Sequence, residues 1–176
     1  MMINLNVGRQ TFDFDCGPKA LQIVFAYYGV EMREDELMTE LKTDENGTPV
    51  QNMIALAEAK GFIVKAGKGF ELEEIKRQVD EGSPVIVLLQ AWSNMYMTLD
   101  DWKKDYDDGH YSIVIGHANG LVVFEDPASF RRTWLTEEEF LARWHDKDPR
   151  TGATYERFAM VLLGKAPVQP VPEHMD

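Results

Sequence analysis

The pattern of apolar residues predicts a buried helix near the start of the chain. Residues 20–28 are apolar on more than one face of a helical projection, which is typical of a helix in the middle of a molecule. Pro18 suits its first turn, because proline lacks an N–H that would have no partner there. Gly29 suits its end, where a left-handed residue commonly closes a helix. We therefore expect one central helix around which the rest of the chain packs.

Further helical periodicity follows in the first half of the chain. Residues 34–41 predict a short amphipathic helix, residues 49–60 a longer one and residues 71–79 a third. Residues 62–64 predict a short strand. Thr48 is expected to cap the second of these helices with its side chain.

The second half of the chain changes to strand-like patterns. Residues 85–89 form a continuous apolar run rich in β-branched side chains, which predicts a strand buried on both faces. Residues 131–135 and 155–163 predict further strands, and Thr136 begins a helix between them. The whole pattern predicts an α+β fold in which the central helix packs on a mostly antiparallel sheet.

The dipeptide 119–120, Asn-Gly, lies between two β-rich runs and predicts a hairpin. The hairpin brings His110, at the start of one strand, back toward Asp126, at the end of the next. With a two-residue loop and a regular ladder, Asp126 faces Ile113 and His110 lies on the opposite face of the sheet. A wider loop or a bulge makes His110 and Asp126 direct cross-strand partners. A hydrogen bond between these two residues therefore predicts an irregular hairpin.

Composition narrows the class of protein. The chain has 176 residues, of which 44% are hydrophobic, and this predicts one domain with a packed core. We expect that domain over residues 1–166 and a flexible, proline-rich tail over residues 167–176. Eighteen Lys and Arg residues against 30 Asp and Glu residues give a net charge of −12. This charge argues against nucleic acid or an anionic membrane as the main partner, and it is compatible with a basic or neutral peptide.

The cellular compartment follows from three features of the sequence. One cysteine allows no internal disulfide. Residues 1–9 lack the basic start and the continuous apolar run of a signal peptide. No segment approaches the roughly 18 uncharged apolar residues that span a bilayer. We therefore expect a cytoplasmic protein without a membrane span.

Cys16 is a candidate nucleophile because it precedes the central helix. Unpaired backbone N–H groups and the helix dipole favour a thiolate at that position, although position alone fits a small buried apolar residue equally well. A cysteine hydrolase also needs an imidazole, a group that orients the imidazole, and donors for the oxyanion. His110 and Asp126 are the candidates for the first two roles. The amide of Gln10 and the backbone N–H of Cys16 are the candidate oxyanion donors.

Residues that contact a substrate are harder to identify. Polar and aromatic side chains gather after residues 85–89 as a candidate cleft wall. We name Trp92, Tyr96 and Tyr111 as the candidate substrate contacts. The acidic and aromatic segment 100–108 is expected to be a surface loop; the alternative is that it holds a cation or steers a basic substrate.

The remaining histidines offer no second candidate site. His117 lies close to the hairpin turn and His145 lies in a segment that looks exposed, so we expect both to be structural or solvated. No spacing of His, Cys or carboxylate residues is typical of a zinc site.

Four groups of residues share a pattern with a known family. They are Gln10 with Asp15-Cys16-Gly17-Pro18 and Ala20-Leu21, then Tyr27-Tyr28-Gly29, then Gly109-His110-Tyr111 with Val114 and Gly116, then Asp126-Pro127-Ala128. The set resembles the bacteriocin-processing cysteine peptidases, which remove double-glycine leader peptides. The resemblance implies a papain-like fold with Cys16 as nucleophile, His110 as general base and acid, Asp126 as orienting group and Gln10 as oxyanion donor. It implies no metal or organic cofactor.

The resemblance also implies a substrate, namely a peptide or protein cleaved after small residues such as a double glycine. Members of the family are often the cytosolic front end of a peptide-exporting transporter. The sequence given has no membrane or ATPase portion, which leaves open an association with a transporter or another partner in trans. Two alternative functions remain open. One is a non-catalytic module that holds a leader or partner peptide on the same fold, and the other is a cysteine acyltransferase.

Overall fold

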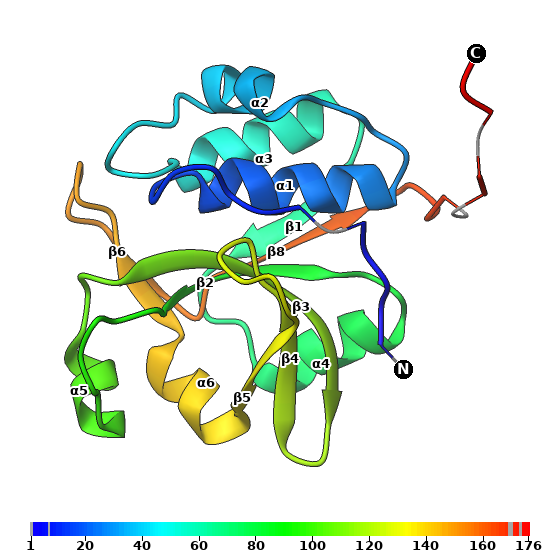
Figure 1. The fold of residues 1–176 in the computed structure, drawn as a ribbon. Coiled ribbons are helices and arrows are strands. Elements are labelled where there is room, and N and C mark those ends of the chain that lie inside the picture. The colour runs from blue at the N-terminus through cyan, green and yellow to red at the C-terminus, as the bar shows by residue number, and fades with distance from the viewer. Residues whose placement is uncertain (1, 7, 169–170, 173) are drawn as a thin grey trace.

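A computed structural model describes residues 2–6, 8–168, 171–172 and 174–176. A six-stranded sheet, in which neighbouring strands run antiparallel, lies between two layers of helices (Figure 1). In spatial order the strands are β1 (Ile63–Gly67), β8 (Ala159–Leu163), β2 (Val85–Gln90), β3 (Gly109–Ala118), β4 (Leu121–Glu125) and β5 (Thr133–Thr136). The predicted α+β class with an antiparallel sheet is confirmed.

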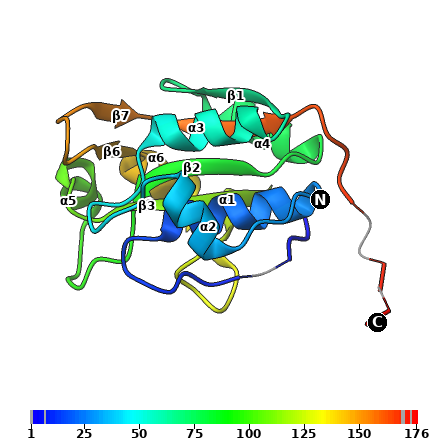
Figure 2. The same ribbon diagram turned by 90° about the horizontal axis from the view of Figure 1, so that it is seen from above.

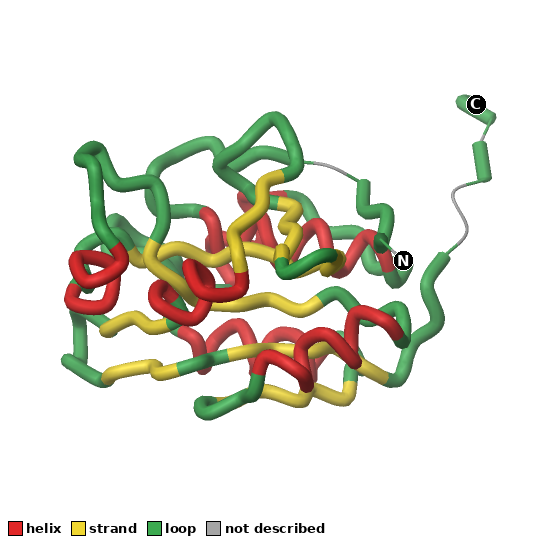
Figure 3. Tube along the Cα trace, turned by 90° about the horizontal axis from the view of Figure 1, so that it is seen from below, coloured by secondary structure: helices red, strands yellow, loops and turns green. Residues whose placement is uncertain are grey.

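Helices cover both faces of this sheet. One layer consists of α1 (Cys16–Tyr27), α2 (Glu34–Glu40) and α3 (Val50–Ala59), which Figure 2 shows together from above. The opposite layer consists of α4 (Leu72–Asp80), α5 (Leu99–Lys104) and α6 (Glu137–Arg143), on the side that Figure 3 shows. No helix in the described part of the chain is long and apolar enough to cross a membrane.

Helix α1 is the predicted central helix. Leu21, Val24 and Phe25 on it are completely buried, and the helix packs on β3 near the middle of the sheet. It ends at Tyr27, and Gly29, two residues further on, has a φ of +76°, the left-handed conformation expected just past a helix. Burial on several faces explains why this segment is apolar nearly all round, and the prediction is confirmed.

The hairpin between β3 and β4 has a tight turn and an irregular ladder. Ala118 pairs with Leu121, so residues 119–120 are the whole loop. The register shifts between Val114 and Gly116, which marks a bulge inside β3 rather than at the turn. The predicted irregularity is therefore present, but it lies within the strand.

The bulge decides which side chains share a face of the sheet. Ile113 pairs with Glu125, so Asp126 lies one step further along, opposite Ser112 rather than Ile113. Because alternate residues of a strand point to the same face, His110 and Ser112 are on one side. The expectation that His110 and Asp126 are direct cross-strand partners is wrong, since they lie diagonally across the ladder. The bulge still brings both side chains to the same face.

Thr48 does not cap α3, contrary to the sequence prediction. The N-cap residue is Pro49, and no side-chain hydrogen bond caps the helix. Thr48 is buried and its hydroxyl bonds to the Thr43 hydroxyl at 2.8 Å instead. Its carbonyl accepts a hydrogen bond from the Tyr111 hydroxyl at 3.0 Å. The hydroxyl and the carbonyl of Thr48 thus bond to Thr43 and Tyr111 instead of capping the helix.

The single strand predicted over residues 155–163 is wrong, because the chain breaks there. Arg157 has a φ of +50°, and this turn separates β7 (Thr154–Glu156) from β8. Strand β7 pairs with β6 (His145–Lys147), a strand that the sequence did not indicate. A second, two-stranded sheet results, and it lies beside β2.

The segment that contains His145 is buried rather than exposed. Trp144 is 1% exposed and its indole N–H donates to the Phe158 carbonyl at 2.8 Å. The His145 ring bonds to the Asp105 carbonyl at 2.7 Å. His145 is therefore a structural residue, which is one of the two expected roles. It is buried, although the polar residues next to it in the sequence indicated an exposed segment.

Residues 100–108 are more ordered than a surface loop. Thr98 caps α5 through a capping box with Asp101. Trp102 is 6% exposed, and the Arg143 guanidinium lies 4.0 Å from the centre of its ring. This segment is anchored to α6 by one aromatic side chain, while most of its carboxylates face outward.

Candidate active site

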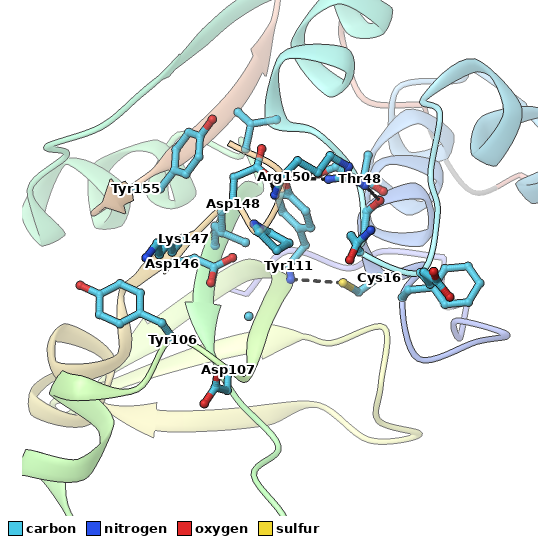
Figure 4. A pocket seen from close by; sticks show the side chains of 18 of the residues that line it. Cys16, Thr48, Tyr106, Asp107, Tyr111, Asp146, Lys147, Asp148, Arg150 and Tyr155 are labelled. Carbon is cyan, nitrogen blue, oxygen red and sulfur yellow. Dashed lines mark hydrogen bonds and ion pairs between the residues drawn. The ribbon is translucent and has the colours of Figure 1, made fainter. Parts of the chain in front are cut away.

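Cys16 is the first residue of α1 and is 7% exposed. The Tyr111 backbone N–H, on β3, donates to Cys16 Sγ at 3.5 Å (Figure 4). The first N–H groups of a helix have no partner within the helix, and they form its positive end. Cys16 therefore lies where several N–H dipoles can stabilise a thiolate.

His110 and Asp126 form a buried hydrogen-bonded pair. His110 Nε2 lies 2.9 Å from Asp126 Oδ1, and both side chains are less than one-tenth exposed. The Ser112 hydroxyl donates to Asp126 Oδ2 at 3.0 Å, and the Ala128 N–H donates to Oδ1 at 2.7 Å. Burial raises the pKa of Asp126, but bonds from His110, Ala128 and Ser112 outweigh burial and lower it below its usual value. Asp126 is thus held as an anion.

Two acidic neighbours influence the charge of His110. Burial lowers the pKa of His110, but hydrogen bonds with Asp126 and Cys16, and the charges of both groups, raise it to about 10. Because Asp126 occupies Nε2, Nδ1 is the nitrogen left for Cys16. The ring is therefore held as an imidazolium between two acidic groups, the charge state that an ion-paired cysteine nucleophile needs.

Gln10 lies in the loop before α1 and is tied to the segment after Asp126. Its backbone N–H donates to the Pro127 carbonyl at 3.0 Å. Its side-chain Nε2 donates to the Phe12 carbonyl at 2.7 Å, and its Oε1 is buried without a partner among the described residues. The bond to Phe12 uses one of the two N–H groups of this amide. The oxyanion role of Gln10 therefore stays a prediction.

Asp15 is a residue of this region to which the sequence analysis gave no role. Its side chain is completely buried, and its two oxygens accept the N–H groups of Thr11, at 2.7 Å, and Phe12, at 2.9 Å. These bonds fix the loop that carries Gln10 directly before the nucleophile. An acidic residue at a helix start is a known capping signal, but here the carboxylate turns back to the preceding loop.

A cavity of about 380 Å³ adjoins Cys16 (Figure 4). Of the three predicted substrate contacts, Tyr111 lines this cavity together with Cys16. Trp92 lines a second cavity of about 190 Å³, which Asp126 also borders. Tyr96 is 91% exposed and lines neither cavity. The structure therefore brings together Tyr111 and the nucleophile and separates the other two aromatic side chains.

The antiparallel sheet with a cysteine at the start of its central helix has the fold of a papain-like cysteine peptidase domain. The peptidase domain of Streptococcus ComA, a bi-functional ABC transporter involved in quorum sensing, is similar with a TM-score of 0.66 and 24% identity, over 90% of this chain and 98% of that one. A double glycine motif protease from an AMS/PCAT transporter, in complex with the leader peptide, is similar with a TM-score of 0.64 and 18% identity, over 92% of each chain. A putative C39-like peptidase from Bacillus anthracis is similar with a TM-score of 0.71 and 16% identity, over 94% of this chain and 98% of that one.

Sequence comparison supplies the family. Residues 4–147 match the Peptidase C39 family, and the chain belongs to it. The resemblance to double-glycine leader peptidases and the papain-like fold are thereby confirmed.

Two curated relatives are proteins that are named as uncharacterized. The one from Methanothermobacter marburgensis is 36% identical over 69 residues, which are 39% of this chain and 48% of the relative. The one from Methanothermobacter thermautotrophicus is 29% identical over 124 residues, 70% of this chain and 72% of the relative. The match thus spans about half of the first relative, and neither name carries an activity.

Proposed function

We propose that this chain is a cysteine peptidase that cleaves a peptide bond after small residues, such as the double glycine of a leader peptide. The observation that carries the proposal is the His110 ring, held between Asp126 and Cys16 with its pKa raised to about 10. A protein that only binds peptides has no need of a buried imidazolium beside its one cysteine.

The proposed reaction has two steps, acylation of Cys16 and hydrolysis of the resulting thioester. The Cys16 thiolate attacks the scissile carbonyl carbon, and the carbonyl oxygen becomes an oxyanion near the Cys16 N–H. His110 gives its proton to the leaving amine, which breaks the C–N bond and leaves a thioester on Cys16. His110 then takes a proton from water, whose oxygen displaces the thiolate. Asp126 orients the ring throughout and stays ionised.

Two features support small residues before the scissile bond. A Cβ on Gly17 would lie 2.8 Å from Thr48 Oγ1 and 3.2 Å from a Tyr111 ring carbon, so the start of α1 already packs tightly. The Tyr111 ring, 5% exposed, is part of the wall beside Cys16. The family supports the same class, since a similar domain was solved with a leader peptide. Tyr111 and the packed start of α1 border the sulfur, and a glycine before the scissile bond adds no side chain against them.

The test is cleavage of synthetic peptides that contain a double glycine, followed by mass spectrometry of the products. We expect a fragment that ends in glycine, and no turnover by the Cys16→Ala protein. Equal turnover by the two proteins would end the proposal. Peptide binding without cleavage by the wild type would favour the non-catalytic alternative, and transfer of the acyl group to an added amine would favour the acyltransferase.

A further inference from the structure

The cavity beside Cys16 has a predominantly acidic wall. Five carboxylates line it, namely Asp13, Glu45, Asp107, Asp146 and Asp148, the last two from one stretch of the chain. Two basic residues, Lys147 and Arg150, also line it. Arg150 Nη2 is already engaged by Asp44 Oδ1 at 2.5 Å and by the Gly47 carbonyl at 2.7 Å. Because Cys16 opens into this cavity, the group that its thiolate attacks has to enter an acidic space.

Asp146 is held in the wall of this cavity by buried neighbours. Gln90, which is completely buried, donates its side-chain N–H to Asp146 Oδ1 at 2.8 Å. A Cβ on Gly109 would lie 2.6 Å from each Asp146 oxygen, so the carboxylate rests directly on the backbone of that glycine. Because alternate residues of a strand point to the same face, Asp146 lies on the face of β3 that Gly109 shares with Tyr111, and this face borders the cavity beside Cys16.

Asp146 takes part in no ion pair within the part of the chain that the structure describes, and its side-chain hydrogen-bond partner is the neutral amide of Gln90. The charge of His145 lowers the pKa of Asp146 without forming such a pair. Burial raises the pKa of Asp146, and hydrogen bonds from Lys147 N–H and Gln90 oppose the rise. A partly buried carboxylate with neutral partners gains most from a cationic ligand.

Aromatic side chains give the same cavity an apolar component. Tyr106, Tyr111 and Tyr155 line it together with the carboxylates. A lysine or arginine side chain combines a charged end with a methylene stem, and it buries the stem on apolar surface where such surface is available. The wall therefore matches both parts of a basic side chain. A small hydrated metal ion would use only the carboxylates, and no three acidic, His or Cys side chains of the described residues converge as a metal site.

We propose that this cavity binds a lysine or arginine side chain of the substrate close to the scissile bond, with Asp146 as the residue that pairs with its charge. The proposal rests on the peptidase function proposed above and adds a specificity to it. Asp107 lines the same cavity and adds attraction at longer range, whereas Asp148 is paired with Arg150 Nη1 at 3.8 Å. The net charge of −12 on the whole chain acts in the same direction.

Pairs of peptides that differ in one residue, lysine or the neutral norleucine, test this proposal. In every peptide the scissile bond follows a glycine. Separate pairs place the variable residue at the second or third position before this bond, or at the first or second position after it. At one position at least, we expect kcat/KM to be about tenfold higher for lysine, the gain of one partly buried charge pair. In Asp146→Asn, which keeps the shape of the side chain, the ratio of lysine to norleucine should fall to near one.

The matched control is Asp100→Asn, an exposed carboxylate on α5 that does not line the cavity. It should leave the ratio at its wild-type value. A ratio near one at every position in the wild type, or an unchanged ratio in Asp146→Asn, overturns the proposal. If no peptide is cleaved, the peptidase function fails by itself. The Kd values of the same peptides for the Cys16→Ala protein then show whether lysine is preferred and whether Asp146→Asn removes that preference.

Discussion

His110 Nε2 lies 2.9 Å from Asp126 Oδ1, although the two residues do not pair across the hairpin that carries them. The bulge between Val114 and Gly116 moves the ladder by one residue and places both side chains on one face of the sheet. Without it, the alternation of side chains would leave them on opposite faces. One inserted residue in β3 therefore holds the proposed catalytic pair together.

Asp126→Asn should lower both the pKa of His110 and the rate of cleavage. The amide removes the negative charge and one of the hydrogen bonds that raise the pKa of His110 to about 10. We expect kcat/KM to fall on the order of 100-fold, which is typical for disturbed acid–base catalysis. The alkaline limb of the pH–rate profile, near pH 10 in the wild type, should move to lower pH. Asp80→Asn is the control, because Asp80 pairs with His117 instead, and it should leave the profile in place.

The His110 pair should also affect stability in a defined pH window. The pKa of His110 rises on folding from 6.5 to about 10, so its charge stabilises the folded state fully below pH 6.5. This contribution is lost as the pH rises through about 10. The difference in unfolding free energy between wild type and Asp126→Asn, measured in urea, should therefore shrink from neutral pH toward pH 10. A difference that stays constant over this range contradicts the assignment.

Gly17→Ala should destabilise the protein and reduce turnover. The new Cβ would lie 2.8 Å from Thr48 Oγ1 and 2.9 Å from Thr48 Cβ, closer than such atoms pack. We expect a loss of about 1–3 kcal/mol, the range for overpacked cores, and a shift of the adjacent Cys16. Urea denaturation and kcat/KM measure the two effects. Gly8→Ala is the matched control, because its nearest contact is a flexible Lys19 side-chain carbon at 3.0 Å. Equal behaviour of the two variants would show that α1 has room to move.

Asp15→Asn should weaken the loop that carries Gln10. In the wild type, the two Asp15 oxygens accept the backbone N–H groups of Thr11 and Phe12. An asparagine keeps one oxygen acceptor, and its NH₂ group faces the other backbone N–H, which then has no acceptor. The expected cost is about 1–3 kcal/mol of unfolding free energy, because a buried donor loses its partner. If the loop positions Gln10, kcat should fall while KM changes little. Asp13→Asn, at an exposed site in the same loop, should keep wild-type stability. Wild-type kcat in Asp15→Asn would argue against a positioning role.

Local patterns were sufficient to predict much of the fold. The helix over residues 20–28 and the strand over residues 85–89 follow from runs of apolar side chains, and the hairpin turn follows from its Asn-Gly pair. The pairing of β6 with β7 and the break at Arg157 depend on contacts between distant segments. No periodicity within one segment reports such contacts, and for that reason both were missed.

The residues of the proposed site also include some that the sequence indicated and some that it did not. Cys16, His110 and Asp126 were found because their chemistry is distinctive and the hairpin signal joins the last two. Asp15 and Asp146 were not found, since the importance of a carboxylate depends on its burial and its partners. An aspartate in a polar stretch has the same sequence signal whether it faces solvent or a cavity.

Activation of Cys16 by His110 is the step on which the proposed cleavage most directly depends. A peptide that ends in glycine and carries a thiol-reactive group should label the protein once, because the chain has a single cysteine. The decisive measurement is the rate of that labelling at neutral pH, followed by intact mass spectrometry, in the wild type and in His110→Ala. We expect the rate to fall on the order of 100-fold or more in the variant, since the imidazolium no longer stabilises the thiolate. Equal labelling rates in the two proteins would contradict the account.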